Sequence, residues 1–233
     1  MNLLAFDSST EHLSIAAQHG AAVCTWEGAG GAQASASMIA AALRLLEQAD
    51  LTLAKLDAIV LGRGPGAFTG LRTACAVAQG LAFGANCPVL PIDTLLAVAE
   101  QARHAHSAER VVALLDARMG EVYSAAYEWQ GDARGWAERA PVRVSAPQAL
   151  ALPTGAGWAL AGNAFEVDAP WPAAAAYLPK LPALPTAGAL LRLAPPLLAA
   201  GRAVPAQQAL PLYIRDKVAL TTAERSAPHA VRP

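Results

Sequence analysis

The segment Gly62-Arg-Gly-Pro-Gly-Ala-Phe-Thr-Gly70 constrains the fold more than any other part of the chain. It follows an apolar run at residues 57–61, which predicts a buried strand, and it leads into residues 69–83, whose spacing predicts a helix. A glycine-rich connection of this kind brings backbone amides and the positive end of a helix dipole to one point. The segment is therefore either a phosphate cradle or a tight turn that belongs to a contact surface.

The two common phosphate-binding patterns are not met. No Lys-Ser or Lys-Thr pair follows the glycines, as a P-loop requires. Gly62, Gly64 and Ala67 match the dinucleotide fingerprint only loosely, because Pro65 interrupts it and no acidic residue follows about 20 positions later. The residues themselves therefore favour a turn or a contact surface over a phosphate site.

The rest of the chain alternates predicted strands and helices, which is typical of an α/β protein. Residues 3–6 predict a strand that ends at Asp7, and residues 111–115 predict another that ends at Asp116. Two openings of the same kind suggest a duplicated unit. Further strands are predicted at 13–17, 21–26, 88–92, 122–129 and 140–144, and further helices at 37–49 and from 93 or 94 to about 103.

A polar stretch at residues 102–110 is the expected boundary between the two units. It divides the chain into an N-terminal subdomain at 1–105 and a C-terminal subdomain at 106–220, followed by a loose tail at 221–233. Prolines are frequent between residues 170 and 196, and they are expected to break any long helix in that region.

The composition excludes several classes of protein. Hydrophobic residues make up 55% of the 233 residues, which is enough apolar material for a sizeable core. A net charge of −1 differs from the strongly basic body of a protein that binds a nucleic acid backbone by itself. Three widely spaced cysteines fit a reducing compartment, and neither a signal peptide nor a long apolar run is recognised. We therefore expect a cytoplasmic protein without a membrane span.

The predicted helix after the glycines has small residues four positions apart, at Gly70, Ala74 and Ala78. Small residues at this spacing allow two helices to approach closely. The spacing predicts either a helix-on-helix interface with a partner or ordinary packing on the chain's own sheet. In the first case, a bulky residue in place of Gly70 or Ala74 is expected to abolish pairing without unfolding the monomer.

The turn Asp7-Ser-Ser-Thr10 begins with a carboxylate between two predicted strands. Such a turn can hold a metal–phosphate group, with the carboxylate ordering waters on Mg²⁺ and the hydroxyls meeting the phosphate. A plain turn with side-chain caps is the alternative. The five histidines form no HExxH or HxxxH pair, and no GxSxG elbow occurs. The residues therefore predict neither a metal site nor a catalytic residue.

Five segments together resemble the TsaB family. They are Leu4-Ala-Phe-Asp-Ser-Ser-Thr10, Gly62-Arg-Gly-Pro-Gly-Ala-Phe-Thr-Gly-Leu-Arg72, Ala78-Gln-Gly-Leu-Ala82, Asp116-Ala-Arg-Met-Gly-Glu-Val-Tyr123 and Pro211-Leu-Tyr-Ile-Arg215. Residues 129–210 show little similarity outside these segments. The resemblance implies an α/β, actin-like ATPase (ASKHA) fold of the ribonuclease-H-like kind, with two subdomains that have mixed sheets and flanking helices.

The resemblance also implies a role. TsaB-like proteins are non-catalytic subunits of the bacterial machinery that makes threonylcarbamoyladenosine (t6A) in tRNA. They pair with and activate a catalytic subunit, TsaD, which transfers threonylcarbamoyl to N6 of adenosine 37 in tRNAs reading codons that begin with A. An ATPase, TsaE, joins them. The chain is then expected to have no cofactor of its own, with ATP or ADP only at the partner interface, to meet tRNA only through the complex, and to form a homodimer when alone.

In that family, the helices flanking the glycines form the face that packs on the catalytic partner. The partner-interface residues predicted on this basis are Gly64, Gly66, Phe68, Thr69, Gly70, Arg72, Ala74 and Ala78. The residues of a relic nucleotide-binding turn are Asp7, Ser8, Ser9 and Thr10. The chain departs from similar proteins at Ala34-Ser35, where they usually have a histidine, so a polar contact made by that histidine is absent.

An enzyme of the same fold is the alternative function, either an ATP-dependent kinase for a small molecule or a metallopeptidase-like enzyme. A kinase would need phosphate turns in both halves and a glycine cluster for adenosine, and the second half offers only Ala161-Gly-Asn163. A peptidase would need metal ligands or a nucleophile with its base, and neither pattern is found.

Overall fold

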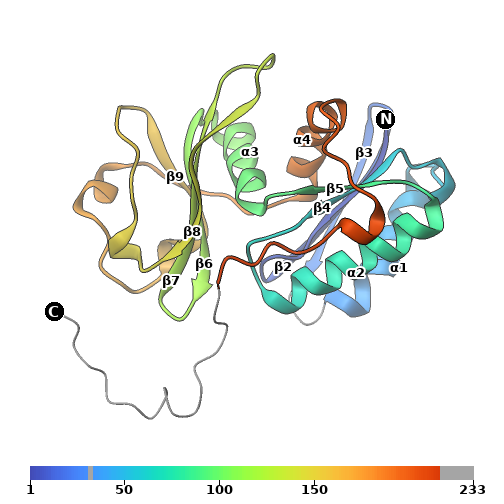
Figure 1. Ribbon diagram of the computed structural model, residues 1–233, viewed down its shortest axis with the longest axis horizontal. Helices are drawn as coiled ribbons and strands as arrows, with labels where there is room; N and C mark the ends of the chain where they lie inside the picture. The colour runs from blue at the N-terminus through green and yellow to red at the C-terminus, as the bar shows by residue number, and fades with distance from the viewer. Residues whose placement is uncertain (31–33, 216–233) are drawn as a thin grey trace, which may run out of the picture.

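The computed structural model describes residues 1–30 and 34–215, and it contains two five-stranded sheets that lie side by side in Figure 1. The strands of the first sheet are β1 (Asn2–Asp7), β2 (His12–His19), β3 (Ala22–Ala29), β4 (Ala58–Gly62) and β5 (Val89–Ile92). The strands of the second sheet are β6 (Arg110–Arg118), β7 (Glu121–Trp129), β8 (Trp136–Ser145), β9 (Trp158–Gly162) and β10 (Lys180–Pro182).

The two sheets share one strand order. The first is β3-β2-β1-β4-β5 and the second is β8-β7-β6-β9-β10. In each sheet three strands form an antiparallel meander, and the remaining two are added in parallel. The duplicated unit suggested by the strands that end at Asp7 and Asp116 is therefore confirmed as a repeated topology.

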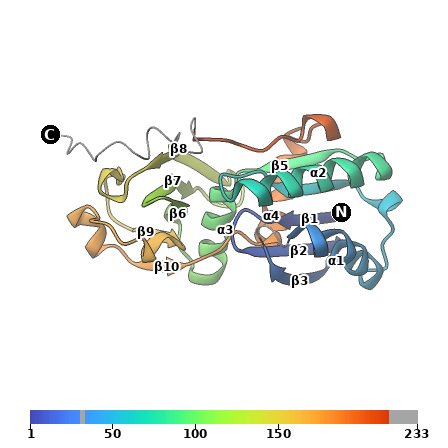
Figure 2. The ribbon, with the colours of Figure 1, turned by 90° about the horizontal axis from the view of Figure 1, so that it is seen from below.

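Within the described residues, four α-helices flank the sheets: α1 (Ala34–Gln48), α2 (Phe68–Ala85), α3 (Thr94–His106) and α4 (Ala187–Ala199). Successive side chains of β1 point to opposite faces, so Leu4 and Phe6 pack under α1 and α2, whereas Leu3 and Ala5 pack under α4. In Figure 2, α2 runs near β5 and α1 lies near β3. None of these helices has the length and apolarity needed to cross a membrane, as far as the described residues extend.

The helix α3 contributes to the cores of both sheets. Ala97 packs with the first sheet, and Leu95 and Val98 pack with the second. The helix continues one turn beyond the predicted end near Arg103 and stops where Ser107 adopts a left-handed conformation with φ of 56°. The division of the chain at residue 105 stays a prediction, and the shared packing of α3 shows that the two units are joined through this helix.

A buried carboxylate on α3 connects three elements. Glu100 accepts hydrogen bonds from Arg103 of α3, from Arg192 of α4 and from the indole of Trp136 of β8, at 2.9–3.1 Å. Burial raises the pKa of Glu100, but these donors lower it by more, so the net pKa lies below its ordinary value. Because α4 packs on the first sheet and β8 belongs to the second, this network ties the two sheets together.

The expectation that prolines break any long helix between residues 170 and 196 is wrong for α4. Pro195 and Pro196 both lie inside this helix, where they remove two backbone donors. The helix persists because Leu190 and Leu193 are buried against the first sheet, and this tertiary packing outweighs the local cost. The predicted tail at 221–233 lies outside the described residues.

Candidate functional site

The Asp7–Thr10 segment (the serine turn) and the Gly62–Gly70 segment (the glycine turn) pack against each other at the start of α2. The backbone N–H of Ala67 donates to the carbonyl of Ser9 at 2.7 Å. The hydroxyl of Ser8 donates to the carbonyl of Gly70 at 2.8 Å. The two turns meet because β1 and β4 are parallel neighbours, so their carboxyl ends lie at the same edge of the sheet.

The glycine turn needs its glycines because the serine turn occupies the space of their missing side chains. A Cβ on Gly66 would overlap the carbonyl group of Ser9, and a Cβ on Gly70 would overlap the carbonyl oxygen of Ser8. Only glycine permits so close an approach of one backbone to another. The glycine turn is therefore a tight turn that packs against a segment of its own chain, and its contact with a partner stays a prediction.

The carboxylate of Asp7 is buried between the serine turn and the glycine turn, where it accepts hydrogen bonds. Asp7 is 1% exposed, and it accepts hydrogen bonds from the N–H and hydroxyl of Ser9 at 2.8 and 2.5 Å and from the hydroxyl of Thr94 at 3.2 Å. Burial raises the pKa of Asp7 by more than these hydrogen bonds lower it. A Cβ on Gly62 would overlap the same carboxylate. Asp7 thus faces the glycine turn, and its role in a relic nucleotide site stays a prediction.

The first residue of α3 completes the contact. The hydroxyl of Thr94 donates to Asp7 and accepts a hydrogen bond from the N–H of Gly64 at 3.1 Å. The N–H of Thr94 donates to the carbonyl of Gly64 at 2.8 Å. The sequence indicated position 94 only as a possible start of this helix. The first strand, the glycine turn and α3 therefore meet in one buried polar cluster.

The segment Pro211–Arg215 crosses from the glycine turn to the second sheet. The N–H of Leu212 donates to the carbonyl of Arg63 at 2.7 Å. Farther along, the guanidinium of Arg215 forms an ion pair with Glu121 at the start of β7. The sequence predicted no structural position for Pro211–Arg215. The structure shows that this segment links the two subdomains.

A stack of exposed side chains lies where this segment passes the first turn of α2. The guanidinium of Arg72 lies 3.8 Å from the centre of the Phe68 ring and donates from Nε to the hydroxyl of Tyr213 at 2.9 Å. The rings of Phe68 and Tyr213 are 5.3 Å apart. Arg72 is thereby held in one orientation, since cation–π contact and a hydrogen bond act on the same group.

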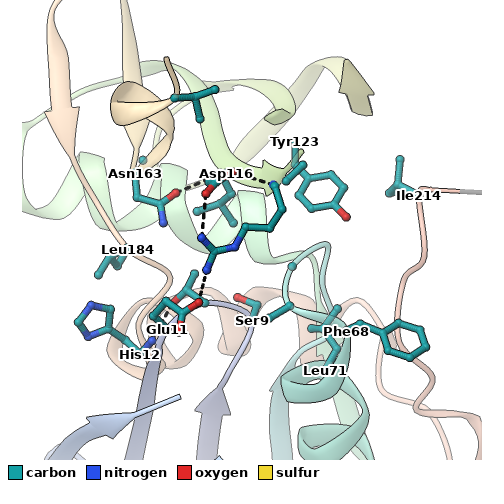
Figure 3. Close-up of a pocket in the computed structure, with 18 of the residues that line it drawn as sticks. Ser9, Glu11, His12, Phe68, Leu71, Asp116, Tyr123, Asn163, Leu184 and Ile214 are labelled. Atoms are coloured by element: carbon teal, nitrogen blue, oxygen red, sulfur yellow. Dashed lines mark hydrogen bonds and ion pairs between the residues drawn. The ribbon is translucent and has the colours of Figure 1, made fainter. Parts of the chain in front are cut away.

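A cleft of about 1090 Å³ lies between the two subdomains. Ser9 and Thr10 line one wall, and the β6–β7 hairpin lines the other. Figure 3 shows Glu11 and Asp116 on opposite sides of this cleft. The guanidinium of Arg118 pairs with Asp116 at 3.3 Å and also with Glu11. Because Glu11 lies between β1 and β2, the Arg118–Glu11 ion pair crosses the cleft from the second sheet to the first.

The structure separates the predicted partner-interface residues into an exposed group and a covered group. The exposed residues are Phe68, Thr69 and Arg72. The others are partly or fully covered by the chain itself: Gly64, Gly66, Gly70, Ala74 and Ala78. The side chains of Ala74 and Ala78 belong to the core beneath α2. This corrects the expectation that a bulky residue at Gly70 or Ala74 would spare the monomer, because it would overlap the carbonyl of Ser8 at Gly70 and overpack the core at Ala74.

The outer face of α1 and α2 carries exposed apolar and small residues at helical spacing. These residues, which we call the outer face, are Ala36, Ile39, Ala40 and Leu43 of α1 and Ala76, Gly80, Phe83 and Gly84 of α2. The two helices cover the same face of the first sheet, and the outer-face residues point away from it. The small residues that the sequence singled out on α2, Gly70, Ala74 and Ala78, are buried on the opposite side of the helix, and their role in a partner interface stays a prediction.

Residues 1–30 and 34–215 contain no group of three or more His, Cys, Asp or Glu side chains placed to hold a metal ion. The predictions that the chain has no metal site, no cofactor of its own and no catalytic residue stay predictions.

Known proteins resemble the chain over nearly its whole length. The family model described as TsaD, tRNA N6-adenosine threonylcarbamoyltransferase, matches residues 32–221. Proteins named tRNA threonylcarbamoyladenosine biosynthesis protein TsaB, from Haemophilus influenzae and Escherichia coli, are 33% and 31% identical over 94% of this chain and 95% and 96% of theirs. The structure of YeaZ from Pseudomonas aeruginosa matches with a TM-score of 0.81 at 38% identity, over 91% of this chain and 99% of that one.

Two mixed sheets of the same strand order, flanking helices and a cleft between them define an α/β protein of the actin-like, ribonuclease-H-like fold, as predicted. Within this fold class, the matches extend through residues 129–210, where the sequence motifs showed little similarity. The chain belongs to the TsaB family.

Proposed function

We propose that the chain is a non-catalytic subunit in the biosynthesis of threonylcarbamoyladenosine in tRNA, and that it docks on a TsaD-type catalytic subunit through its outer face. The first part is supported by the relatives, which are named for this biosynthesis, and by the match to the transferase family model. The second part is supported by the residues of α1 and α2 that point away from the sheet.

The observation that carries the docking proposal is the pair of exposed glycines on α2. Gly80 lies inside the helix and Gly84 in its last turn, and a Cβ on either would meet no atom within 4 Å. A glycine inside a helix is about 1 kcal/mol less favourable than alanine. Because the described part of the chain does not use the space beside these glycines, that space suits the close approach of a helix from another protein.

The side chains around these glycines suit the centre of an interface. Ile39, Leu43 and Phe83 are exposed by 47%, 44% and 84%, and burial of such apolar surface favours association. At the beginning of α2, the stack of Phe68 and Arg72 supplies an aromatic ring and a held guanidinium, which are residue types enriched at interface hot spots. The partner therefore meets an apolar centre with a polar anchor at one end.

In this proposal, the TsaD-type subunit transfers threonylcarbamoyl to N6 of adenosine 37, and this chain activates it by pairing, together with a TsaE-type ATPase. ATP or ADP binds at the interface with the partner, and the tRNA is held by the complex as a whole. The buried carboxylate of Asp7 supports a non-catalytic role, because handling of a metal–phosphate group would require this carboxylate to face the cleft. When the chain is alone in the cytoplasm, its outer face pairs with a second copy.

Reconstitution of tRNA modification tests the proposal. Purified TsaD-type and TsaE-type proteins, tRNA and the threonylcarbamoyl adenylate are incubated with and without this chain, and modified adenosine is quantified. We expect modification to depend on the chain. Equal modification in its absence would refute the subunit role, and ATP hydrolysis or phosphoryl transfer by the pure chain would favour the kinase alternative.

A further inference from the structure

We infer that the serine turn sets the direction of the docking helix α2, and that Asp7 and Ser8 act as positioning residues for the outer face. This inference rests on the proposed function, because it names what holds the docking surface in place. It also gives the serine turn a purpose that does not involve a nucleotide. The clamp is buried and has two parts: the Ser8 hydroxyl, which contacts the backbone of α2, and the Asp7 carboxylate, which orders the serine turn and Thr94 beside it.

The helix α2 depends on neighbours for the organisation of its first turn. Its N-cap residue, Ala67, makes no side-chain hydrogen bond, and the first turn contains no acidic residue. The serine turn contacts this region twice, since the carbonyl of Ser9 accepts from the N–H of Ala67 and the hydroxyl of Ser8 donates to the carbonyl of Gly70. The first contact pairs a helix-start amide that would otherwise lack an acceptor, and the second adds a buried hydrogen bond to the first helical turn.

The carboxylate of Asp7 acts one step before the helix. It holds the hydroxyl of Thr94, and this hydroxyl in turn accepts from the N–H of Gly64. It also orders Ser9 through two hydrogen bonds, and Ser9 contacts the residue that precedes α2. The serine turn therefore contacts the glycine turn at three places: at Gly64 through Thr94, at Ala67 before the helix, and at Gly70 in the first helical turn.

The packed side of α2 is built mostly of small residues, and the partly buried Val77 and Leu81 also pack against the core. Its buried positions are mostly small, namely Gly70, Ala74, Ala78 and Ala82, with Leu71 and Cys75 beside them. A surface of glycine and alanine presents shallow ridges, so it fixes the angle of a helix less firmly than interlocking large side chains do. The contacts at the first turn consequently carry more of the orientation than they would in a helix with a bulky core face.

Small tilts at the first turn become large displacements at the outer face. Gly80 is ten residues beyond Gly70, which corresponds to about 15 Å along a helix. A tilt of about 5° at Gly70 therefore moves Gly80 by about 1.3 Å. A contact between helices that depends on a glycine has no flexible side chain to absorb such a shift, so partner affinity responds to the clamp.

Two matched pairs of variants test the inference. Ser8→Ala removes the buried hydroxyl that donates to α2, and Ser14→Ala removes a buried hydroxyl that accepts from the N–H of Ala187 at the start of α4, on the opposite face of the sheet. Asp7→Asn and Glu100→Gln alter two buried carboxylates, of which only the first contacts the glycine turn. Thermal midpoints are measured for the four variants and the unsubstituted chain, and their affinities for the purified TsaD-type subunit are measured by titration calorimetry.

We expect Ser8→Ala and Asp7→Asn to weaken partner binding by roughly tenfold, or about 1.4 kcal/mol, more than control variants of equal thermal stability. A purely structural role would reduce affinity by the same factor in both members of a pair. Equal effects, with the unsubstituted chain binding well, would overturn this inference alone. Failure of the unsubstituted chain to bind the partner would overturn the proposed function and this inference with it.

Discussion

A leucine in place of Gly80 is expected to stabilise the monomer and to weaken its pairing with the partner. Leucine is about 0.8 kcal/mol more favourable than glycine in a helix interior, and a Cβ at this position would meet no atom of the chain within 4 Å. In the complex, the same side chain would fill the space proposed for a partner helix. Overpacking a close contact costs about 1–3 kcal/mol, so the dissociation constant should rise roughly 5- to 150-fold.

Gly80→Leu is expected to raise the stability of the monomer and to lower its affinity for the partner, so this one variant separates an effect on docking from an effect on folding. Urea denaturation measures the free energy of unfolding, and titration calorimetry with the TsaD-type subunit measures the dissociation constant. Ala105→Leu, at an exposed position in the last turn of α3, is the control and should leave the affinity unchanged. A Gly80→Leu protein that binds the partner with unchanged affinity would show that the outer face is not the docking surface. A less stable Gly80→Leu monomer would contradict the inference that the space beside Gly80 is unoccupied in the free chain.

Three further substitutions probe the buried contacts. Gly62→Ala should lower the free energy of unfolding by about 1–3 kcal/mol in urea titration, because its Cβ would overlap the Asp7 carboxylate; an unchanged value would contradict this. Tyr127→Phe should be neutral or stabilising by up to about 1 kcal/mol, since this buried hydroxyl has no hydrogen-bond partner among the described residues; a thermal midpoint lower by several degrees would argue against it. The pKa of Glu100 is lowered in the fold, so its ionised form stabilises the protein above the unfolded pKa, and this stabilisation is lost as the pH falls through the folded pKa. Wild type should therefore lose stability relative to Glu100→Gln below about pH 4.5, and parallel melting curves across that range would contradict the sign.

The sequence predicted most elements of the first half well, because apolar runs there alternate with clear turn residues. The helix expected at 69–83 is Phe68–Ala85, and the strand expected at 57–61 is Ala58–Gly62. In the second half, β9, β10 and α4 escaped prediction. Alanine and proline are unfavourable in strands, which obscured β9 and β10, and Pro195 and Pro196 argued against α4, which persists because it packs on the first sheet.

The candidate site was predicted in its parts but not in its assembly. The serine turn and the glycine turn were both recognised, yet their direct contact follows from the parallel pairing of β1 and β4, which no local pattern reveals. The Glu11–Arg118 ion pair across the cleft was not predicted either, because it joins residues that are distant in the sequence.

Residue types in a fixed local order are enough to predict the glycine turn, the topology class and the family. The side of α2 that is exposed, and so available to a partner, depends on the tertiary structure. The helix has two stripes of small residues, Gly70–Ala74–Ala78 and Ala76–Gly80–Gly84, and both satisfy the same spacing rule. The serine turn and the first sheet lie against the first stripe, so the fold leaves the second stripe on the outer face.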